Sequence, residues 1–230
     1  MKKLNFIFAA AAVALTACQQ APAPQAEAEC ADCKAMLQLI EDIPTTQAFL
    51  ADAVDEADLQ RIVNAGVNAP SALNQQPWHF TVVTNADEIK QMGEAMKGAM
   101  QNGPAPAPKG DGKDDAPKPP TASGPHSGLG DSPVVIVISC KPGNELDAGL
   151  AVQNMNAMAH LLGYGTKIAS SVNMLFNGEN KDEYYAKFLV PEGMNITTAL
   201  LVGKMDTEKW DATTSATPRK PQTETVTTVK

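Results

Sequence analysis

The sequence predicts one layered domain of the α/β or α+β class, because helical and strand patterns alternate along the chain without any internal repeat. Residues 133–140 form a continuous apolar run, which is typical of a strand buried on both faces. Residues 144–162 carry apolar side chains on almost every helical face, which predicts a central, buried helix. These two segments are expected to form the middle of the core.

The other expected elements follow in order along the chain. Asp55 predicts an N-cap, and the helix after it should end at 68–71, because Pro70 disfavours helical geometry at Ala69. Gly163 and Gly165 should end the central helix. Further helices are expected over 34–41, 85–100 and 181–189, further strands over 78–84 and 196–202, and a polar tail from 211.

The N-terminus carries the pattern of an export signal. Lys2 and Lys3 precede a nearly unbroken apolar run over 4–15, which is shorter than the roughly 18 residues needed to cross a bilayer. Residues 15–18, Leu-Thr-Ala-Cys, resemble the lipobox of bacterial lipoproteins, in which the cysteine is lipidated and the chain is cut before it. We therefore expect a signal peptide over 1–17, lipid on Cys18, and a cell-envelope location on the periplasmic side of a membrane or at the cell surface. The alternative is an ordinary secretory signal with an accidental cysteine.

Residues 18–33 should form a flexible tether, because 19–29 contain only Pro, Ala, Gln and Glu. Cys30 and Cys33 close this tether and allow a disulfide, a redox pair or a metal site with partners elsewhere. The domain itself should span 34–230. Within it, the proline-rich stretch 103–131 is expected to be a long mobile loop.

Composition argues against nucleic acid as a partner. The formal charge is −8 with only 18 Lys and Arg, and no basic cluster follows the signal. No residue pattern predicts a resident metal, because the chain has no second cysteine pair to complete a zinc site.

The most specific string covers 69–80, Ala-Pro-Ser-Ala-Leu-Asn-Gln-Gln-Pro-Trp-His-Phe. It closely resembles the motif of the FMN-dependent nitroreductase family, and four later segments fit the family in order: 147–155, 162–166, 200–203 and 218–221. The resemblance implies an α+β sandwich with a central mixed sheet flanked by helices. It also implies an intertwined homodimer with FMN at the dimer interface.

The resemblance further assigns cofactor contacts. Pro70, Ser71 and Ala72 would line the flavin, while Asn74, in a string that also contains Gln76, would hydrogen-bond its pyrimidine edge, unless Asn74 only caps the turn. Trp78 and Phe80 are read as core residues. The segment 166–170, with Ile168, Ala169 and Ser170, would bring backbone N–H groups to the reactive N5 side, and Arg219 with Lys220 would pair with the phosphate.

One departure from the family pattern bears on the cofactor. Pro44 and Gln47 stand where the family carries phosphate-binding arginines, although Phe49 is at the expected place. Losing two charge-assisted contacts would weaken binding by roughly 1.5 to 3 kcal/mol each. Thr45, Thr46 and Gln47 still offer neutral hydrogen bonds, so weak FMN binding and none at all both stay open.

The leading functional hypothesis is an FMN-dependent oxidoreductase that takes hydride from a donor such as NAD(P)H and reduces a nitro, quinone or similar acceptor. The cofactor carries this chemistry, so no side chain is assigned a catalytic role. The alternative is a non-catalytic envelope lipoprotein that keeps the fold and binds another small ligand or a protein partner. A third reading is thiol redox chemistry at Cys30 and Cys33.

Overall fold

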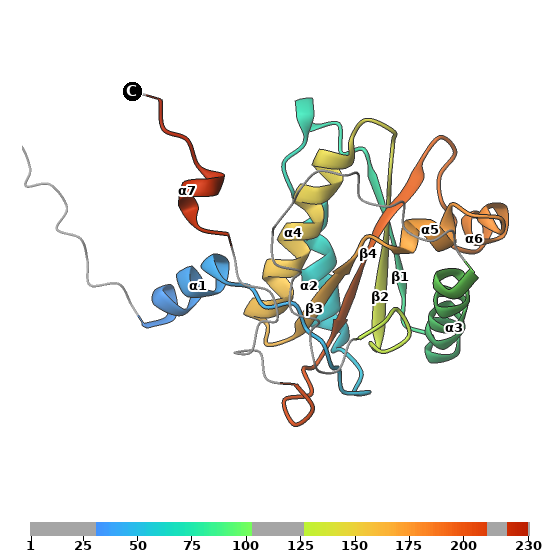
Figure 1. The fold of residues 1–230 in the computed structure, drawn as a ribbon, viewed down its shortest axis with the longest axis horizontal. Coiled ribbons are helices and arrows are strands. Elements are labelled where there is room, and N and C mark those ends of the chain that lie inside the picture. Colours follow the sequence, from blue (N-terminus) through green and yellow to red (C-terminus); the bar gives the residue numbers. More distant parts are fainter. Residues whose placement is uncertain (1–30, 103–126, 211–219, 230) are drawn as a thin grey trace, which may run out of the picture.

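The computed structural model describes residues 31–102, 127–210 and 220–229 (Figure 1). Four strands form one sheet, with helices on both of its faces. The elements are α1 (Ala31–Glu41), α2 (Glu56–Val67), the 3-10 turn η1 (Ala72–Asn74), β1 (Trp78–Val83), α3 (Ala86–Asn102), β2 (Val134–Cys140), α4 (Glu145–Leu161), β3 (Gly165–Ala169), α5 (Val172–Phe176), α6 (Lys181–Lys187), β4 (Asn195–Gly203) and α7 (Gln222–Thr225).

The strand order is β1-β2-β4-β3, and each neighbouring pair is antiparallel. The prediction of a mixed sheet is therefore wrong for the strands that the structure describes. The strand order explains the difference. β1 is parallel to β4, but β2 lies between them, and β2 is parallel to β3, but β4 lies between them, so parallel strands are never neighbours. β3 is an edge strand, so one side of its backbone is not paired within the sheet.

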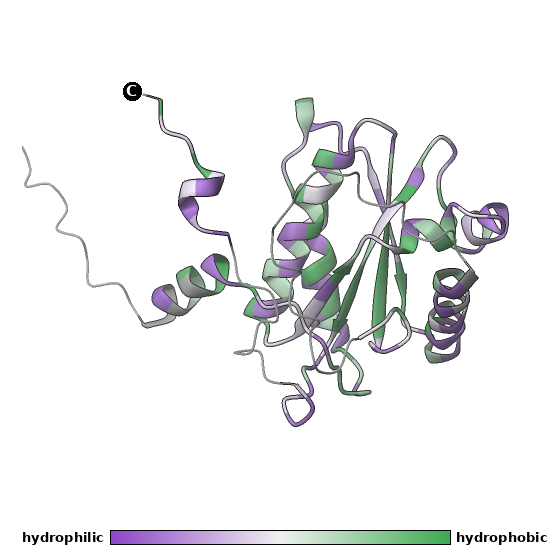
Figure 2. Ribbon diagram, in the orientation of Figure 1, coloured by the Kyte–Doolittle hydropathy of each residue, from purple (hydrophilic) through white to green (hydrophobic). Residues whose placement is uncertain are grey.

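β2 is buried over its whole length, as its apolar run predicts. Alternate side chains of β2 enter two separate clusters, one on each face of the sheet. One cluster packs against α3, α5 and α6, and the other packs against α2 and α4. Figure 2 shows the strands in the green of hydrophobic residues between the two helical layers. Cys140 lies fully buried in this core, where burial raises the pKa of its thiol.

Local signals set most helix ends. The Asp55 carboxylate accepts hydrogen bonds from the N–H groups of Ala57 and Asp58, as expected of an N-cap. Asn85 caps α3 in the same way by accepting from Glu88 N–H. After α4, Gly163 adopts a φ of +85°, which a glycine tolerates without strain.

The expectation that α4 is a central, buried helix holds for its inner side chains only. Its side chains at Ala151, Met155 and Ala159 are inaccessible, but Leu146 is 77% exposed and Leu150 is 40% exposed. α4 is an outer layer of the sandwich (Figure 1), and although the described helix α1 contacts it, Leu146 and Leu150 near its start stay exposed. The sequence pattern placed apolar side chains on almost every face of the helix, and the fold leaves Leu146 and Leu150 among them exposed.

The edges of some predicted segments differ from the structure. α1 begins at Ala31 and so includes Cys33, three residues before the predicted start. The end of the predicted loop is ordered, because Ser127 and Leu129 are buried. The strand β3 and the short helix α5 were not predicted. No helix among the described residues is long and apolar enough to cross a membrane. The expected signal peptide, Cys18, Cys30, most of the proline-rich loop and Arg219 lie outside the described residues.

Candidate functional site

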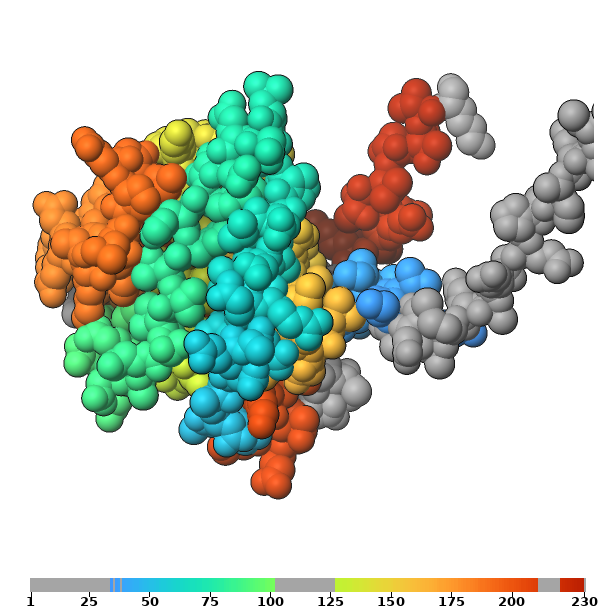
Figure 3. Space-filling view, turned by 180° about the vertical axis from the view of Figure 1, so that it is seen from behind, coloured from blue at the N-terminus to red at the C-terminus, as the bar shows by residue number. Residues whose placement is uncertain are grey.

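The Pro-Ser-Ala turn, residues 70–76, has an unusual backbone. Leu73, Asn74 and Gln76 have φ values of 52°, 54° and 47°, a left-handed region that costs energy for residues other than glycine. The turn also projects from the body of the molecule, and Leu73 is 92% exposed (Figure 3). A strained turn with an exposed leucine does not stabilise an isolated chain, so its conformation points to a functional role.

Two polar contacts hold this turn in shape. The Ser71 hydroxyl accepts a hydrogen bond from Gln76 N–H at 2.9 Å. Ala72 N–H donates to the carboxylate of Asp147 at 3.3 Å, and Asp147 is buried in the first turn of α4. A carboxylate at this end of a helix also interacts favourably with the helix dipole. The turn is thus fixed to the N-terminus of α4.

An apolar platform supports the turn from below. Trp78 is buried with Ala69 and Ala151, and its ring stacks on Phe80 at a centroid distance of 6.1 Å. Trp78 therefore belongs to the core, as predicted, while Phe80 is half-buried beside it.

The amide of Asn74 is oriented by its neighbour. Gln76 Nε2 donates to Asn74 Oδ1 at 3.2 Å, which leaves the Asn74 NH₂ group directed away from the turn. Both side chains are exposed. The arrangement leaves the Asn74 NH₂ group as a donor on an exposed side chain.

The edge strand β3 forms a second group of predicted residues. Thr46 N–H donates to the carbonyl of Thr166 at 2.8 Å, so the segment that replaces the family arginines runs alongside β3. In an antiparallel ladder alternate residues point their backbone groups to the same side, so Ile168 N–H also faces this edge. Ile168 and Ser170 are exposed, whereas Ala169 is half-buried against the α3–α5 cluster.

Lys167 is the cation of this second group. Its Nζ donates to Gln47 Oε1 at 3.1 Å and to the Ser127 carbonyl at 2.5 Å. Burial lowers the pKa of Lys167, and the nearby charge of Asp131 partly opposes this effect. The ammonium group of this half-buried side chain is therefore hydrogen-bonded to neutral acceptors.

A buried polar cluster fixes β3 to α4. The Thr166 hydroxyl donates to Asn156 Oδ1 and also contacts His160 Nε2 at 3.0 Å. Because the Thr166 hydrogen is used by Asn156, His160 must be the donor in the second contact. Burial lowers the pKa of His160. In the part of the chain that the structure describes, no group of three or more His, Cys, Asp or Glu could hold a metal ion.

The turn and the β3 group are attached to different ends of α4, the turn through Asp147 and β3 through Asn156 and His160. No hydrogen bond between described residues joins 70–76 to 168–170, and the turn lies beside the N-terminus of α4 while Thr46 and Lys167 lie along β3 (Figure 1). Lys220 is exposed and lies in a segment with α7 that stands apart from the sandwich. The predicted contacts therefore form at least two separate half-sites.

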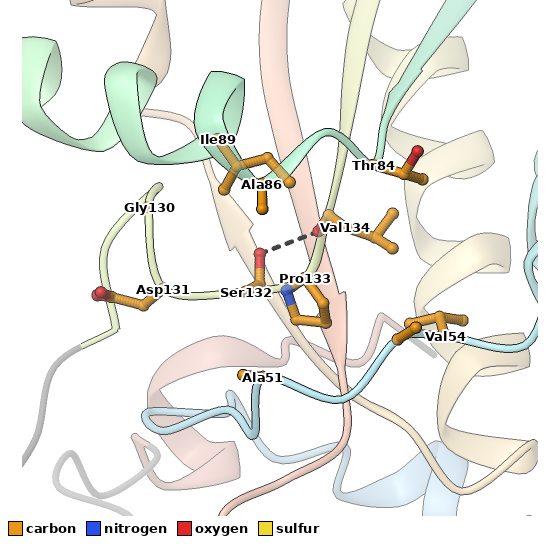
Figure 4. A pocket seen from close by; sticks show the side chains of 11 residues that line it. Ala51, Val54, Thr84, Ala86, Ile89, Gly130, Asp131, Ser132, Pro133 and Val134 are labelled. Carbon is orange, nitrogen blue, oxygen red and sulfur yellow. Dashed lines mark hydrogen bonds between the residues drawn. The ribbon is translucent and has the colours of Figure 1, made fainter.

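A cavity of about 400 Å³ opens at the other end of the sheet from the turn. Its walls combine the segment 51–54 with the ends of β1 and β2, and Ser132 Oγ donates to the Val134 carbonyl there at 2.9 Å (Figure 4). The lining is mostly alanine, valine, proline and glycine, and none of the predicted cofactor residues contributes to it.

The sequence interpretation missed two residues of these half-sites. Asp147 was visible as a carboxylate on a helix expected to be buried, which is a signal for a specific hydrogen-bond partner. Lys167 is the one charged residue in 166–170, a segment that was expected to contribute only backbone N–H groups, and this charge was the signal that could have identified it. Their partners, Ala72 and Gln47, are 75 and 120 residues away in sequence, so only the fold reveals the pairs.

Comparison with known proteins identifies the fold. In solved structures, the chain is similar to a nitroreductase with bound FMN from Bacteroides fragilis, with a TM-score of 0.64, 20% identity, and coverage of 85% of this chain and 98% of that one. A nitroreductase with bound FMN from Desulfitobacterium hafniense gives a TM-score of 0.66 at 21% identity, with the same coverage.

Two curated relatives carry the name NADH dehydrogenase/NAD(P)H nitroreductase. The one from Archaeoglobus fulgidus is 45% identical over 60 residues, which is 26% of this chain and 34% of the relative. The one from Methanothermobacter thermautotrophicus is 25% identical over 138 residues, or 56% of this chain and 58% of the relative. The matches thus span about a third and less than three fifths of the relatives' lengths. The model of the nitroreductase family matches residues 44–204, and because this match covers well over half of the chain, the protein belongs to the nitroreductase family.

Proposed function

We propose that the protein is an FMN-dependent oxidoreductase of the nitroreductase type, which reduces nitro, quinone or similar acceptors with NAD(P)H as a possible donor. The observation that carries the proposal is the division of the predicted cofactor contacts into two half-sites that no hydrogen bond between described residues joins. A homodimer would let the turn of one subunit meet β3 of the other. The family, and the FMN in the two solved nitroreductases, support the same cofactor.

The residues of the two half-sites fit FMN. Bound FMN would supply the redox chemistry by accepting a hydride and passing electrons to the acceptor. The chain's own part is binding and orientation: Asn74 offers an amide donor, Ile168 an edge N–H group, and Lys167 a cation. The Pro-Ser-Ala turn would cover one face of the ring and exclude water from it.

Exposed apolar side chains support the homodimer. Leu146 and Leu150 are exposed one helical turn apart on α4, and Leu73 is exposed on the turn that the Ala72–Asp147 hydrogen bond attaches to the start of α4. Burying a leucine side chain yields about 1.5 to 3 kcal/mol. These exposed side chains belong to elements of one half-site, where contact with a second copy would also complete the cofactor site.

The test is the absorption spectrum of the purified protein together with FMN titration. We expect a flavin band, and we expect Asn74→Gly to weaken FMN binding, because glycine keeps the left-handed backbone but removes the amide. The control is Gln75→Ala in the same turn, where φ is −73° and the side chain is exposed. A colourless protein that gains no band with added FMN would refute the proposal.

Such a colourless protein would favour the second candidate, a non-catalytic protein that keeps the fold and binds another ligand or a protein partner. Gln47 in place of a family arginine supports this candidate, because its amide supplies no charge to a phosphate. Dimerisation without flavin would then be the expected result.

We further propose that the chain is exported and anchored to a membrane of the cell envelope by lipid on Cys18. The charged start, the short apolar run and the cysteine motif support this proposal. Labelled fatty acid should be incorporated into the expressed chain and be absent from a Cys18→Ser variant. Label retained by Cys18→Ser would contradict the anchor.

A further inference from the structure

Lys167 has an incomplete set of partners. An ammonium group has three N–H donors. Two of them are used by Gln47 Oε1 and the Ser127 carbonyl, and both acceptors are neutral. Among the described residues, no other acceptor is in hydrogen-bond contact with the third donor, so the group can bind one more ligand.

The charge of Lys167 is also not neutralised. No carboxylate of the described residues lies within 4.0 Å of its Nζ. Asp131, whose charge acts on Lys167 from further away, uses its Oδ2 to accept a hydrogen bond from Gly128 N–H at 2.5 Å. A half-buried cation without an anion is costly. An anionic ligand would remove this cost.

Gln47 adds a neutral donor beside the cation. Its Oε1 is held by Lys167, which orients the side chain, and its Nε2 donates one hydrogen to the Thr45 carbonyl at 3.3 Å. The second hydrogen of Nε2 remains available. Lys167 and Gln47 thus present one charged and one neutral donor, and a charged donor makes a strong hydrogen bond with phosphate.

We propose that Lys167, oriented by Gln47, binds the phosphate group of FMN in place of the arginines that the resemblance led us to expect at 44 and 47. This inference rests on the proposed function. The ammonium group of Lys167 on strand β3 contacts the side chain of Gln47. The positive charge that is missing at residue 47 is thus supplied by residue 167. Lys167 is a binding residue for the phosphate and takes no part in the chemistry of the ring.

The experiment compares FMN with riboflavin, which has the same ring but no phosphate. Dissociation constants of both flavins are measured by quenching of flavin fluorescence for the full chain and for Lys167→Met. We expect Lys167→Met to weaken FMN binding roughly ten- to a hundred-fold and to leave riboflavin binding unchanged. Lys167→Arg should restore most of the preference for FMN. The control is Lys97→Met, because Lys97 is exposed on α3 and pairs with Glu94.

Each result separates this inference from the proposed function. A wild-type protein that prefers FMN and a Lys167→Met variant with the same preference would overturn the role of Lys167 and leave the flavin function intact. An equal loss of both flavins would also overturn it, because Lys167 would then act only as structural support. A wild-type protein that binds neither flavin would overturn both proposals.

Discussion

At the scale of single residues, the two half-sites depend on close contacts between distant parts of the chain. Gly165 begins β3 and is packed against the side chains of Thr46 and Met205, so that a Cβ at this position would collide with both. Thr46 is fully buried and holds the carbonyl of Thr166. The absence of a side chain at residue 165 therefore keeps the segment of Gln47 next to β3.

Gly165→Ala should lower the free energy of unfolding by about 1 to 3 kcal/mol, because the new methyl group must displace buried neighbours. The measurement is urea unfolding followed by circular dichroism. The matched control is Gly98→Ala in α3, where a Cβ meets nothing within 4 Å. Alanine is the better helix former, so the control should be stabilised by about 1 kcal/mol. Equal stability of the two variants would contradict the close contact at Gly165.

Asp147→Ala should destabilise the protein by about 1 to 3 kcal/mol and weaken flavin binding, because it leaves Ala72 N–H without its acceptor. Asp147→Asn keeps an acceptor oxygen and should stay close to the wild type in both measurements. The two variants are compared by urea unfolding and by FMN titration. If Asn behaved as badly as Ala, the charge of Asp147 and not its hydrogen bond would be what matters.

At the scale of elements, α4 and β3 act as a pair. α4 holds the Pro-Ser-Ala turn through Asp147 at its start, and it holds β3 near its end through Asn156 and His160. Both half-sites are thus attached to the same helix, although they do not touch each other. Small movements of α4 would shift the turn and the edge strand together.

Protonation of His160 should weaken this pair. Its pKa is lowered in the folded state by burial, so the unfolded chain, with a pKa near 6.5, binds the proton first as the pH falls. Stability is then complete above pH 6.5 and declines below it, with a slope of at most about 1.4 kcal/mol per pH unit, until the folded-state pKa is passed. Urea unfolding across roughly pH 5 to 8 measures it. Carboxylates also lower the stability at acid pH, so the wild type is compared with His160→Gln. If stability fell with pH equally steeply in both proteins, His160 would not be its cause.

At the scale of the whole molecule, the described chain is an incomplete structure. It presents a strained turn, an edge strand whose outer side is only partly covered, through the Thr46–Thr166 hydrogen bond, and an outer helix with exposed leucines. Contact with a second copy would bury the exposed leucines and pair backbone groups of the edge strand. The homodimer that we propose would do so beside the strained turn, whose conformational cost it must exceed.

Leu146→Glu should convert the dimer to a monomer and abolish flavin binding, because the charge would be buried in the interface. Light scattering measures the mass, and FMN titration measures the binding. The control is Leu189→Glu, since Leu189 is equally exposed at 78% but follows α6 on the other face of the sheet. A Leu146→Glu protein that remains dimeric would place the interface elsewhere.

The sequence by itself determined the N-cap at Asp55, the buried strand β2 and the turn motif. Each of these depends on residues that are close together in the chain. Asp55 caps the helix that follows it, 133–140 is one apolar run, and 69–80 is one string. The tertiary structure decided which face of α4 stays exposed, that the sheet is antiparallel throughout, and that Lys167 lies against Gln47. The physical reason is range. Capping and periodicity are local, whereas the contacts of the site join residues that are 40 to 120 positions apart in the chain.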